Sequence, residues 1–183
     1  MSQTIHDRAK AIKLLLMDVD GVLTDGKIYF LPAPDGTWTE TKVFDTQDGL
    51  ALQWLHTYGI KTGLISGRKS PATTLRAETA HMVYNYQGHL EKIPMIESIK
   101  KDSGLSAEEI AFVGDDFTDV VIFNRVGWAV AVANARTEVK QSAHYVTTTP
   151  GGQGAIREVA EILLKTQGHW DDVLEHYEIG RED

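Results

Sequence analysis

Short apolar runs rich in Val, Ile and Leu recur along the chain, and longer stretches with helical spacing separate them. Such alternation predicts an α/β fold in which a mostly parallel sheet is covered by helices on both faces. The predicted strands are Lys13–Met17, Lys61–Ile65, Met82–Tyr84, Ile110–Val113 and Trp128–Val132, with Tyr145–Thr147 as a candidate sixth. The predicted helices are Asp48–Tyr58, Pro71–Ala80, Ile93–Ser103, Asp116–Asn124, Arg136–Ser142 and Ala155–Thr166.

Composition excludes several classes of function. The 183 residues suit one domain, which we expect to span residues 1–183. No cysteine is present, so disulfides, thiolate zinc sites and cysteine nucleophiles are excluded. A formal charge of −8 argues against a nucleic-acid partner. No apolar run approaches the ~20 residues of a membrane helix, and the polar start does not resemble a signal peptide, so we expect a cytoplasmic protein with no membrane partner.

Two segments depart from the strand–helix alternation. Lys27–Leu31 and Trp38–Phe44 flank the Pro32–Gly36 turn, which predicts a β-hairpin insert at about residues 27–44 that projects after the first strand. The C-terminal tail, at about residues 168–183, places Trp170, Val173, Leu174 and Tyr177 on one helical face. That face could dock on its own domain or on a neighbouring chain, and the sequence favours neither.

Polar clusters follow three of the predicted strands. In parallel α/β sheets, ligands bind beyond the carboxyl ends of the strands, so we expect these clusters to converge on one site. The clusters are Asp18 with Asp20, Ser66 with Gly67 and Arg68, and Gly114 with Asp115 and Asp116.

The first and third clusters supply carboxylates. Asp18 and Asp20 point to one side of an extended chain, and their repulsion favours a cation between them. We interpret Asp18 as a nucleophile and Asp20 as a general acid and base, with Mg²⁺ bridging to the substrate. Asp115 can complete an oxygen site for Mg²⁺, while Asp116 and Asp119 could orient their neighbours. Alternatively, these acids form an acidic turn and cap a helix.

The second cluster and Lys92 supply donors for an anion. Ser66, Gly67 and Arg68 offer a hydroxyl, a flexible backbone and a cation, which are the groups that a phosphoryl group requires. Lys92 follows the third predicted strand and could offset charge on that group. The alternatives are an ordinary loop before a helix and a solvated lysine.

Taken in chain order, the Asp18–Asp20 cluster, the Ser66 loop, Lys92 and the Gly114–Asp119 cluster resemble the haloacid dehalogenase superfamily, and the resemblance covers nearly the whole chain. Within it, the chain is similar to the family of 3-deoxy-D-manno-octulosonate (KDO) 8-phosphate phosphatases, which serve lipopolysaccharide precursor synthesis. The segments that carry this narrower resemblance are Asp18–Gly26, the hairpin, Phe44–Gly49, Ser66–Lys69, Tyr86–Gly88 with Lys92, Gly114–Asp119, and Gly151–Ala155 with Arg157 and Glu158.

The resemblance implies a Rossmann-like three-layer α/β/α core with a minimal cap, and hydrolysis of a sugar-acid phosphate through an aspartyl phosphate. It implies that Mg²⁺ is bound by the Asp18 carboxylate, the Asp20 carbonyl and Asp115. It also implies that Ser66 and Lys92 hold the phosphoryl group. A homotetramer built through the hairpins is implied as well, with a neighbour's surface closing each site.

Arg68 and Arg157 are then candidates for the sugar carboxylate. Two features depart from the family: a longer hairpin turn, and Ala51 where a glycine is expected after Asp48-Gly49. Both leave the phosphatase chemistry intact and bear on the substrate. The alternatives are a phosphatase for a nonulosonate 9-phosphate or another sugar phosphate, a non-catalytic module that carries a phosphoaspartate, and a structural subunit.

Overall fold

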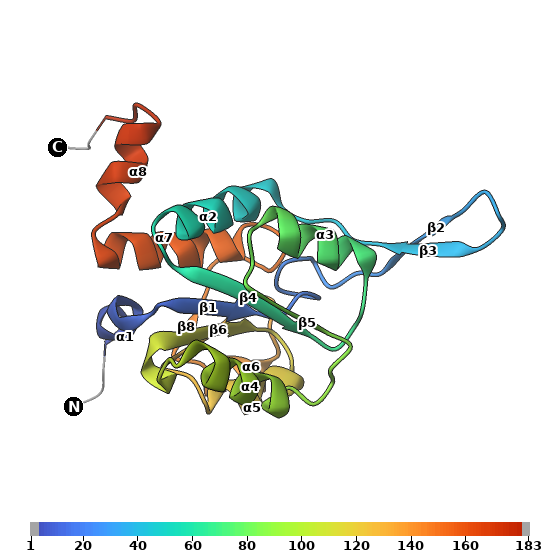
Figure 1. The fold of residues 1–183 in the computed structure, drawn as a ribbon, viewed down its shortest axis with the longest axis horizontal. Helices are drawn as coiled ribbons and strands as arrows, with labels where there is room; N and C mark the ends of the chain where they lie inside the picture. Colours follow the sequence, from blue (N-terminus) through green and yellow to red (C-terminus); the bar gives the residue numbers. More distant parts are fainter. Residues whose placement is uncertain (1–3, 181–183) are drawn as a thin grey trace.

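The computed structural model describes residues 4–180 and contains a six-stranded sheet in which every neighbouring pair is parallel (Figure 1). The strand order is β5-β4-β1-β6-β7-β8, with β1 near the middle. The prediction of a mostly parallel α/β sheet is therefore confirmed. The strands are β1 Leu14–Met17, β4 Lys61–Ser66, β5 Tyr84–Gln87, β6 Ile110–Gly114, β7 Trp128–Ala131 and β8 Tyr145–Val146.

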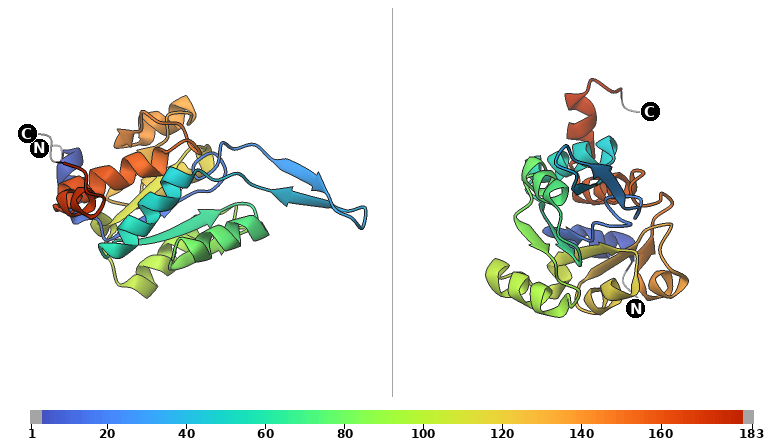
Figure 2. Two further views of the ribbon diagram at one scale, coloured as in Figure 1. Left: turned by 90° about the horizontal axis from the view of Figure 1, so that it is seen from above. Right: turned by 90° about the vertical axis from the view of Figure 1, so that its right-hand side faces the viewer.

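Helices cover both faces of this sheet, which gives three layers (Figures 1 and 2). On one face lie α2 Thr46–Thr57, α3 Pro71–Thr79 and α7 Ala155–Gln167. On the other lie α4 Ile93–Ser103, α5 Phe117–Phe123 and α6 Thr137–Ser142. The longest helix, α7, has 13 residues, and among residues 4–180 no helix has the length and apolar character needed to cross a bilayer.

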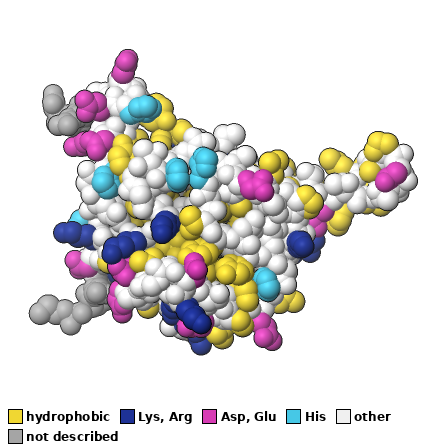
Figure 3. All heavy atoms as spheres, in the orientation of Figure 1, with side chains coloured by type: hydrophobic (Ala, Val, Ile, Leu, Met, Phe, Trp, Pro, Cys, Tyr) yellow, Lys and Arg dark blue, Asp and Glu magenta, His cyan; other side chains and the backbone are white. Residues whose placement is uncertain are grey.

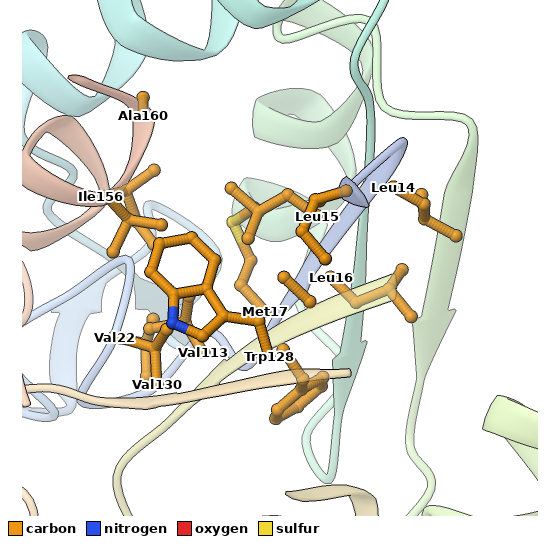
Figure 4. Close-up of a cluster of buried hydrophobic side chains, with 14 of the residues drawn as sticks. Leu14, Leu15, Leu16, Met17, Val22, Val113, Trp128, Val130, Ile156 and Ala160 are labelled. Carbon is orange, nitrogen blue, oxygen red and sulfur yellow. The ribbon is translucent and has the colours of Figure 1, made fainter. Parts of the chain in front are cut away.

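The core lies on both sides of β1. All four residues of β1 are buried, and they meet Val113 of β6, Trp128 of β7 and Ile156 of α7 (Figure 4). A strand that is buried on both faces carries an unbroken apolar run, which is why the sequence showed it clearly. This rigid centre ends where the first acidic cluster begins, at Asp18.

The third strand is displaced from its predicted position. We predicted Met82–Tyr84, but β5 covers Tyr84–Gln87 and pairs with β4 from Gly63↔Tyr84 to Ser66↔Gln87. Because β5 is an edge strand and none of its residues is fully buried, its sequence is polar and the apolar run ahead of it misled the prediction. A short helix, α1 Ile5–Ala11, was also not predicted.

The predicted hairpin is present, with shorter strands. β2 Tyr29–Pro32 and β3 Trp38–Thr41 pair in antiparallel register and extend away from the body of the molecule (Figures 1 and 2). No third strand joins them within the described chain. Hydrophobic side chains lie along the hairpin surface (Figure 3): Phe30 is 56% exposed, Leu31 55% and Trp38 68%.

The C-terminal tail docks on its own chain. Helix α8 Trp170–His176 buries Val173, and the Trp170 ring meets the edge of Trp54 on α2 with the ring centroids 5.9 Å apart. The Trp54 Nε1–H donates a hydrogen bond to the Tyr177 hydroxyl at 3.1 Å. The last three residues of the predicted tail lie outside the described residues. A hollow of about 480 Å³ remains between α2 and α8, at the end of the sheet opposite the hairpin (Figure 1).

Candidate active site at the carboxyl edge of the sheet

Strand register brings the predicted acidic clusters together. Asp18 directly follows β1, and Asp115 directly follows β6. The two strands are neighbours with Met17 opposite Val113, and the Asp18 N–H donates to the Val113 carbonyl at 3.0 Å. Side chains that are 97 positions apart in the sequence therefore emerge next to each other at one edge of the sheet.

Three carboxylates form one compact group. One oxygen each from Asp18, Asp115 and Asp119 lie within 4.8 Å of one another. Their donor set consists of hard oxygens, which suits Mg²⁺. Gly21 makes room for Asp115, because a Cβ at Gly21 would lie 2.1 Å from Asp115 Oδ2. The residues present therefore fit a divalent cation.

Lys92 supplies the positive charge beside this group. Its side chain is only 1% exposed, and its Nζ lies 2.6 Å from Asp119 Oδ1 and 3.1 Å from Asp18 Oδ2. A buried ammonium is costly unless it is paired, so two carboxylates hold it in place. The structure brings Lys92 to the acidic group, as the sequence predicted.

The titration of these groups reflects burial and crowding. Burial raises the pKa of Asp18, and the charge of Asp119 raises it further, while Lys92 lowers it. Burial, Asp119 and Asp18 raise the pKa of Asp115 to about 8. Burial lowers the pKa of Lys92, but Asp119 and Asp18 outweigh this effect and raise it. The surroundings thus oppose full ionisation of the carboxylates, and a divalent ion that binds them displaces protons.

Asp116 and Asp119 build the start of α5. Asp116 Oδ1 accepts the Phe117 N–H at 2.7 Å, and Asp119 Oδ2 accepts the N–H groups of Asp115 and Asp116 at 2.9 and 3.3 Å. The bond from the Asp116 N–H to the Asp119 side chain, together with the return bond from the Asp119 N–H to the Asp116 side chain, forms a capping box. Asp119 therefore joins Lys92 to the loop that carries Asp115, while Asp116 caps the helix.

The loop after β4 reaches the same edge. Ser66 is the last residue of β4, and its buried Oγ accepts the Arg68 N–H at 3.2 Å. The backbone at Gly67 lies so close to Leu90 that a Cβ added at Gly67 would be 2.9 Å from Cδ2 of Leu90. The Arg68 guanidinium is half-exposed and pairs with Glu40 of β3.

Arg157 is not among the residues that the structure brings to the acidic group. Its guanidinium lies 4.0 Å from the centre of the Trp54 ring, and its Nε is 2.7 Å from Glu161 Oε1. Arg157 is one helical turn from Glu161 on α7, so the short local ion pair holds it along the helix. Among residues 4–180, no recorded contact joins this side chain to the acidic group.

Sequence reasoning missed Lys42. This residue follows β3 directly, its side chain is 2% exposed, and its Nζ pairs with Asp20 Oδ1. The same Nζ lies 3.5 Å from Glu40 Oε1. Lys42 and Asp20 are separated by the whole hairpin, so no local spacing signalled the contact.

The glycine turn that precedes α7 also contributes to the site, although its sequence signal was weak. A Cβ at Gly151 would lie 1.8 Å from the Gly21 carbonyl oxygen, so only glycine fits against the loop that carries Asp20. Asn134 joins the two loops: its Oδ1 accepts the Gly151 N–H at 2.7 Å, and its Nδ2 donates to the Gly21 carbonyl at 3.3 Å. No motif or spacing in the sequence pointed to Asn134.

Comparison with known proteins agrees with this geometry. Residues 77–158 match the family described as haloacid dehalogenase-like hydrolase. The chain is 37% identical over 172 residues to the 3-deoxy-D-manno-octulosonate 8-phosphate phosphatase of Salmonella typhi, which covers 94% of this chain and 89% of that protein.

Solved structures give the same result. A probable YrbI family phosphatase from Pseudomonas syringae has a TM-score of 0.90 and 39% identity, and the match covers 98% of this chain and 100% of that one. The 3-deoxy-D-manno-octulosonate 8-phosphate phosphatase of Moraxella catarrhalis, solved with magnesium, phosphate and KDO, has a TM-score of 0.89 and 37% identity, with coverage of 94% and 97%. On these grounds the chain belongs to the haloacid dehalogenase-like hydrolases, within the family of 3-deoxy-D-manno-octulosonate 8-phosphate phosphatases.

Proposed function

We propose that this chain is a Mg²⁺-dependent phosphatase that hydrolyses 3-deoxy-D-manno-octulosonate 8-phosphate to KDO and phosphate. The observation that carries the proposal is the buried carboxylate of Asp18, which lies beside Lys92 and shares an oxygen cluster with Asp115 and Asp119. A nucleophilic carboxylate must approach a phosphate dianion, and cationic groups at this point offset their repulsion.

In the first step, Asp18 attacks phosphorus. A bond forms between an Asp18 oxygen and phosphorus as the bond from phosphorus to the sugar oxygen breaks, and Asp20 donates a proton to that leaving oxygen. Lys92 stabilises charge on the phosphoryl oxygens, and the Ser66 hydroxyl and Gly67 amide donate hydrogen bonds to them. The products of this step are the free sugar and an aspartyl phosphate.

In the second step, water hydrolyses the aspartyl phosphate. Asp20, now ionised, takes a proton from the water, whose oxygen attacks phosphorus as the bond to Asp18 breaks. Phosphate leaves and both carboxyl groups return to their starting states. One residue thus serves as acid and then as base, which microscopic reversibility favours.

Mg²⁺ fits the oxygen cluster, and we assign the Asp18 carboxylate, the Asp20 carbonyl and Asp115 as its protein ligands, with Asp116 and Asp119 supporting them. The ion supplies electrostatic stabilisation of the phosphoryl group and its attacking carboxylate. Asp119 supports the site through its bonds to Lys92 and to the Asp115 N–H.

For the sugar carboxylate we propose Arg68, which is half-exposed at the same edge. Its Nη2 already pairs with Glu40, so a substrate carboxylate would bind beside that ion pair or replace it. Arg157 remains a candidate only if its pairing with Glu161 and Trp54 is broken.

The decisive experiment measures phosphate release, with and without Mg²⁺, from a panel of substrates. The panel contains KDO 8-phosphate, a nonulosonate 9-phosphate, and neutral sugar phosphates. We expect the largest kcat/KM for KDO 8-phosphate and loss of turnover after chelation. A higher kcat/KM for the nonulosonate 9-phosphate would identify that compound as the substrate instead. A long-lived phosphoaspartate without turnover would indicate a regulatory module.

We further propose that the chain assembles as a homotetramer through its hairpins and acts in the cytoplasm. The exposed side chains of Phe30, Leu31 and Trp38 support assembly, because an isolated two-stranded hairpin is marginally stable and exposed apolar patches mark interfaces. A charged sugar phosphate does not cross a bilayer unaided, which supports hydrolysis in the compartment where the substrate is made.

A further inference from the structure

Asp20 is held from outside its own loop. Lys42 Nζ pairs with Oδ1 of Asp20, whereas Oδ2 is buried and has no hydrogen-bond partner among the described residues. A buried carboxylate oxygen without a donor is costly. Oδ1 of Asp20 is therefore held by Lys42, while Oδ2 is left to interact with a bound substrate.

The cation that fixes Asp20 is itself restrained. The Lys42 side chain is 2% exposed, and its Nζ also lies 3.5 Å from Oε1 of Glu40. Glu40 also pairs with Arg68, so an alternating chain of charges runs from Asp20 through Lys42 and Glu40 to Arg68. A lysine that is buried between two carboxylates has lost the rotational freedom of a surface lysine, and it can hold a partner in one orientation.

We propose that Lys42 is a positioning residue for the reaction: by binding Oδ1 it orients the Asp20 carboxyl so that Oδ2 is the oxygen that meets the sugar's leaving oxygen. This inference rests on the proposed function and deepens it. Lys42 belongs to the return of the hairpin, so the segment that projects from the fold also orients a group at the reacting edge.

Leaving-group chemistry separates this role from a structural one. A sugar alkoxide is a poor leaving group and needs a proton from Asp20, whereas 4-nitrophenolate leaves without one. The value of kcat/KM reports the steps from substrate binding up to release of the alcohol, so the proton donation by Asp20 is included in it, and the comparison of the two substrates separates that donation from the other steps. A variant that only loosens the fold lowers kcat/KM for both substrates equally.

The experiment uses Lys42→Met, which keeps length and removes charge, in the Mg²⁺-loaded full chain. We expect kcat/KM for KDO 8-phosphate to fall at least tenfold and kcat/KM for 4-nitrophenyl phosphate to fall less than threefold. Lys42→Arg should recover much of the loss. Lys27→Met is the matched control: Lys27 also lies in the hairpin stem but is exposed and pairs with Asp25, so both substrates should be unaffected.

A second comparison keeps the inference falsifiable if Lys42→Met is unstable. In an Asp20→Asn background, replacing Lys42 by Met or Gln should cause no further loss, because Lys42 acts only through Asp20. Equal losses for both substrates, or a further loss in that background, would overturn the inference. So would a rise in KM confined to carboxylated substrates, which would make Lys42 a substrate ligand. Failure of the proposed function is distinct, since the wild-type chain would then release no phosphate from KDO 8-phosphate.

Discussion

At the carboxyl edge of the sheet the chain buries charge, whereas in the β2–β3 hairpin it exposes large hydrophobic side chains. Asp18, Lys92 and Asp119 are buried, while Phe30 and Trp38 are exposed. Both arrangements are unfavourable for an isolated folded chain. The difference supports both proposals made above: an ion and an anionic substrate would bind at the buried charges, and a second copy of the chain would cover the exposed rings.

The largest effect is expected from Asp18→Asn. Asparagine keeps the shape but cannot form the phosphoryl bond, so turnover should fall by at least about 10³-fold. Burial already disfavours the charged form of Asp18, so the thermal midpoint should fall by no more than about 2 °C. Phosphate release and thermal unfolding measure the two effects, with exposed Asp35→Asn as the control. Near-normal turnover would disprove the assignment of the nucleophile.

The hairpin half of the comparison is tested by Trp38→Glu. A charge in place of a central aromatic ring should weaken self-association by about 2–4 kcal/mol, while the fold of each chain is retained. Sedimentation over a range of concentrations measures this change. Leu75→Glu, an equally exposed position on α3, should leave association unchanged. A wild-type chain that remains monomeric at every concentration would contradict the proposed role of the hairpin.

The pH dependence of Mg²⁺ binding tests the role of the buried carboxylates. Mg²⁺ competes with protons at Asp115, whose pKa is raised to about 8, so apparent Mg²⁺ affinity should fall about tenfold per pH unit below about 8. Calorimetry in buffers of different ionisation enthalpy measures the released protons. Asp115→Asn should remove the dependence between pH 7 and 8, whereas below pH 7 Asp18, whose pKa is raised to about 7, should still compete with Mg²⁺. An affinity of the wild-type chain that does not change from pH 6 to 8 would contradict the prediction.

The raised pKa of Asp115 also determines whether the free energy of unfolding rises or falls with pH. Between about pH 4 and 8, we expect the folded protein without Mg²⁺ to hold a proton on Asp115 that the unfolded chain has lost. The contribution of this group to the free energy of unfolding is therefore fully present near pH 4 and is lost as the pH rises towards 8. Added Mg²⁺ should oppose that loss, most strongly at the alkaline end of the window.

The smallest effect is expected where α8 docks on α2. Tyr177→Phe removes the hydrogen bond from Trp54 but keeps the ring, so it should cost about 1 kcal/mol or less of unfolding free energy. Catalysis should be unchanged, because this contact lies at the opposite end of the sheet. Chemical denaturation and phosphate release test the two statements. Tyr29→Phe is the control: it removes only a long, exposed hydrogen bond of 3.4 Å to Asp25, so it should cost less stability than Tyr177→Phe.

Much of the fold could be predicted from sequence because its central strands are buried on both faces. The unbroken apolar run of β1 marks such a strand, and the rule for parallel sheets then brings Asp18 and Asp115 to one edge. The edge strand β5 was misplaced because a half-exposed strand has no apolar run. The docking face of α8 was visible as a helical stripe, but nothing in the sequence identified Trp54 as its partner.

The part of the site that could not be predicted depends on tertiary approach. Lys42 reaches Asp20 only because the hairpin returns to its own base, and Asn134 reaches Gly21 across 113 positions. Neither contact has a periodicity or a spacing motif. The position of Arg157 also depends on packing: an acid one turn away and a facing tryptophan hold its side chain along α7, and its contact with the sugar carboxylate stays a prediction.

The positions of α1 and α8 have a practical consequence. Both lie at the end of the sheet opposite the hairpin (Figures 1 and 2). A fluorophore or a surface linker attached to α1 or α8 would therefore lie at the opposite end of the sheet from the reacting carboxylates. Immobilised and single-molecule assays of turnover can therefore use attachment points that lie away from the reacting carboxylates.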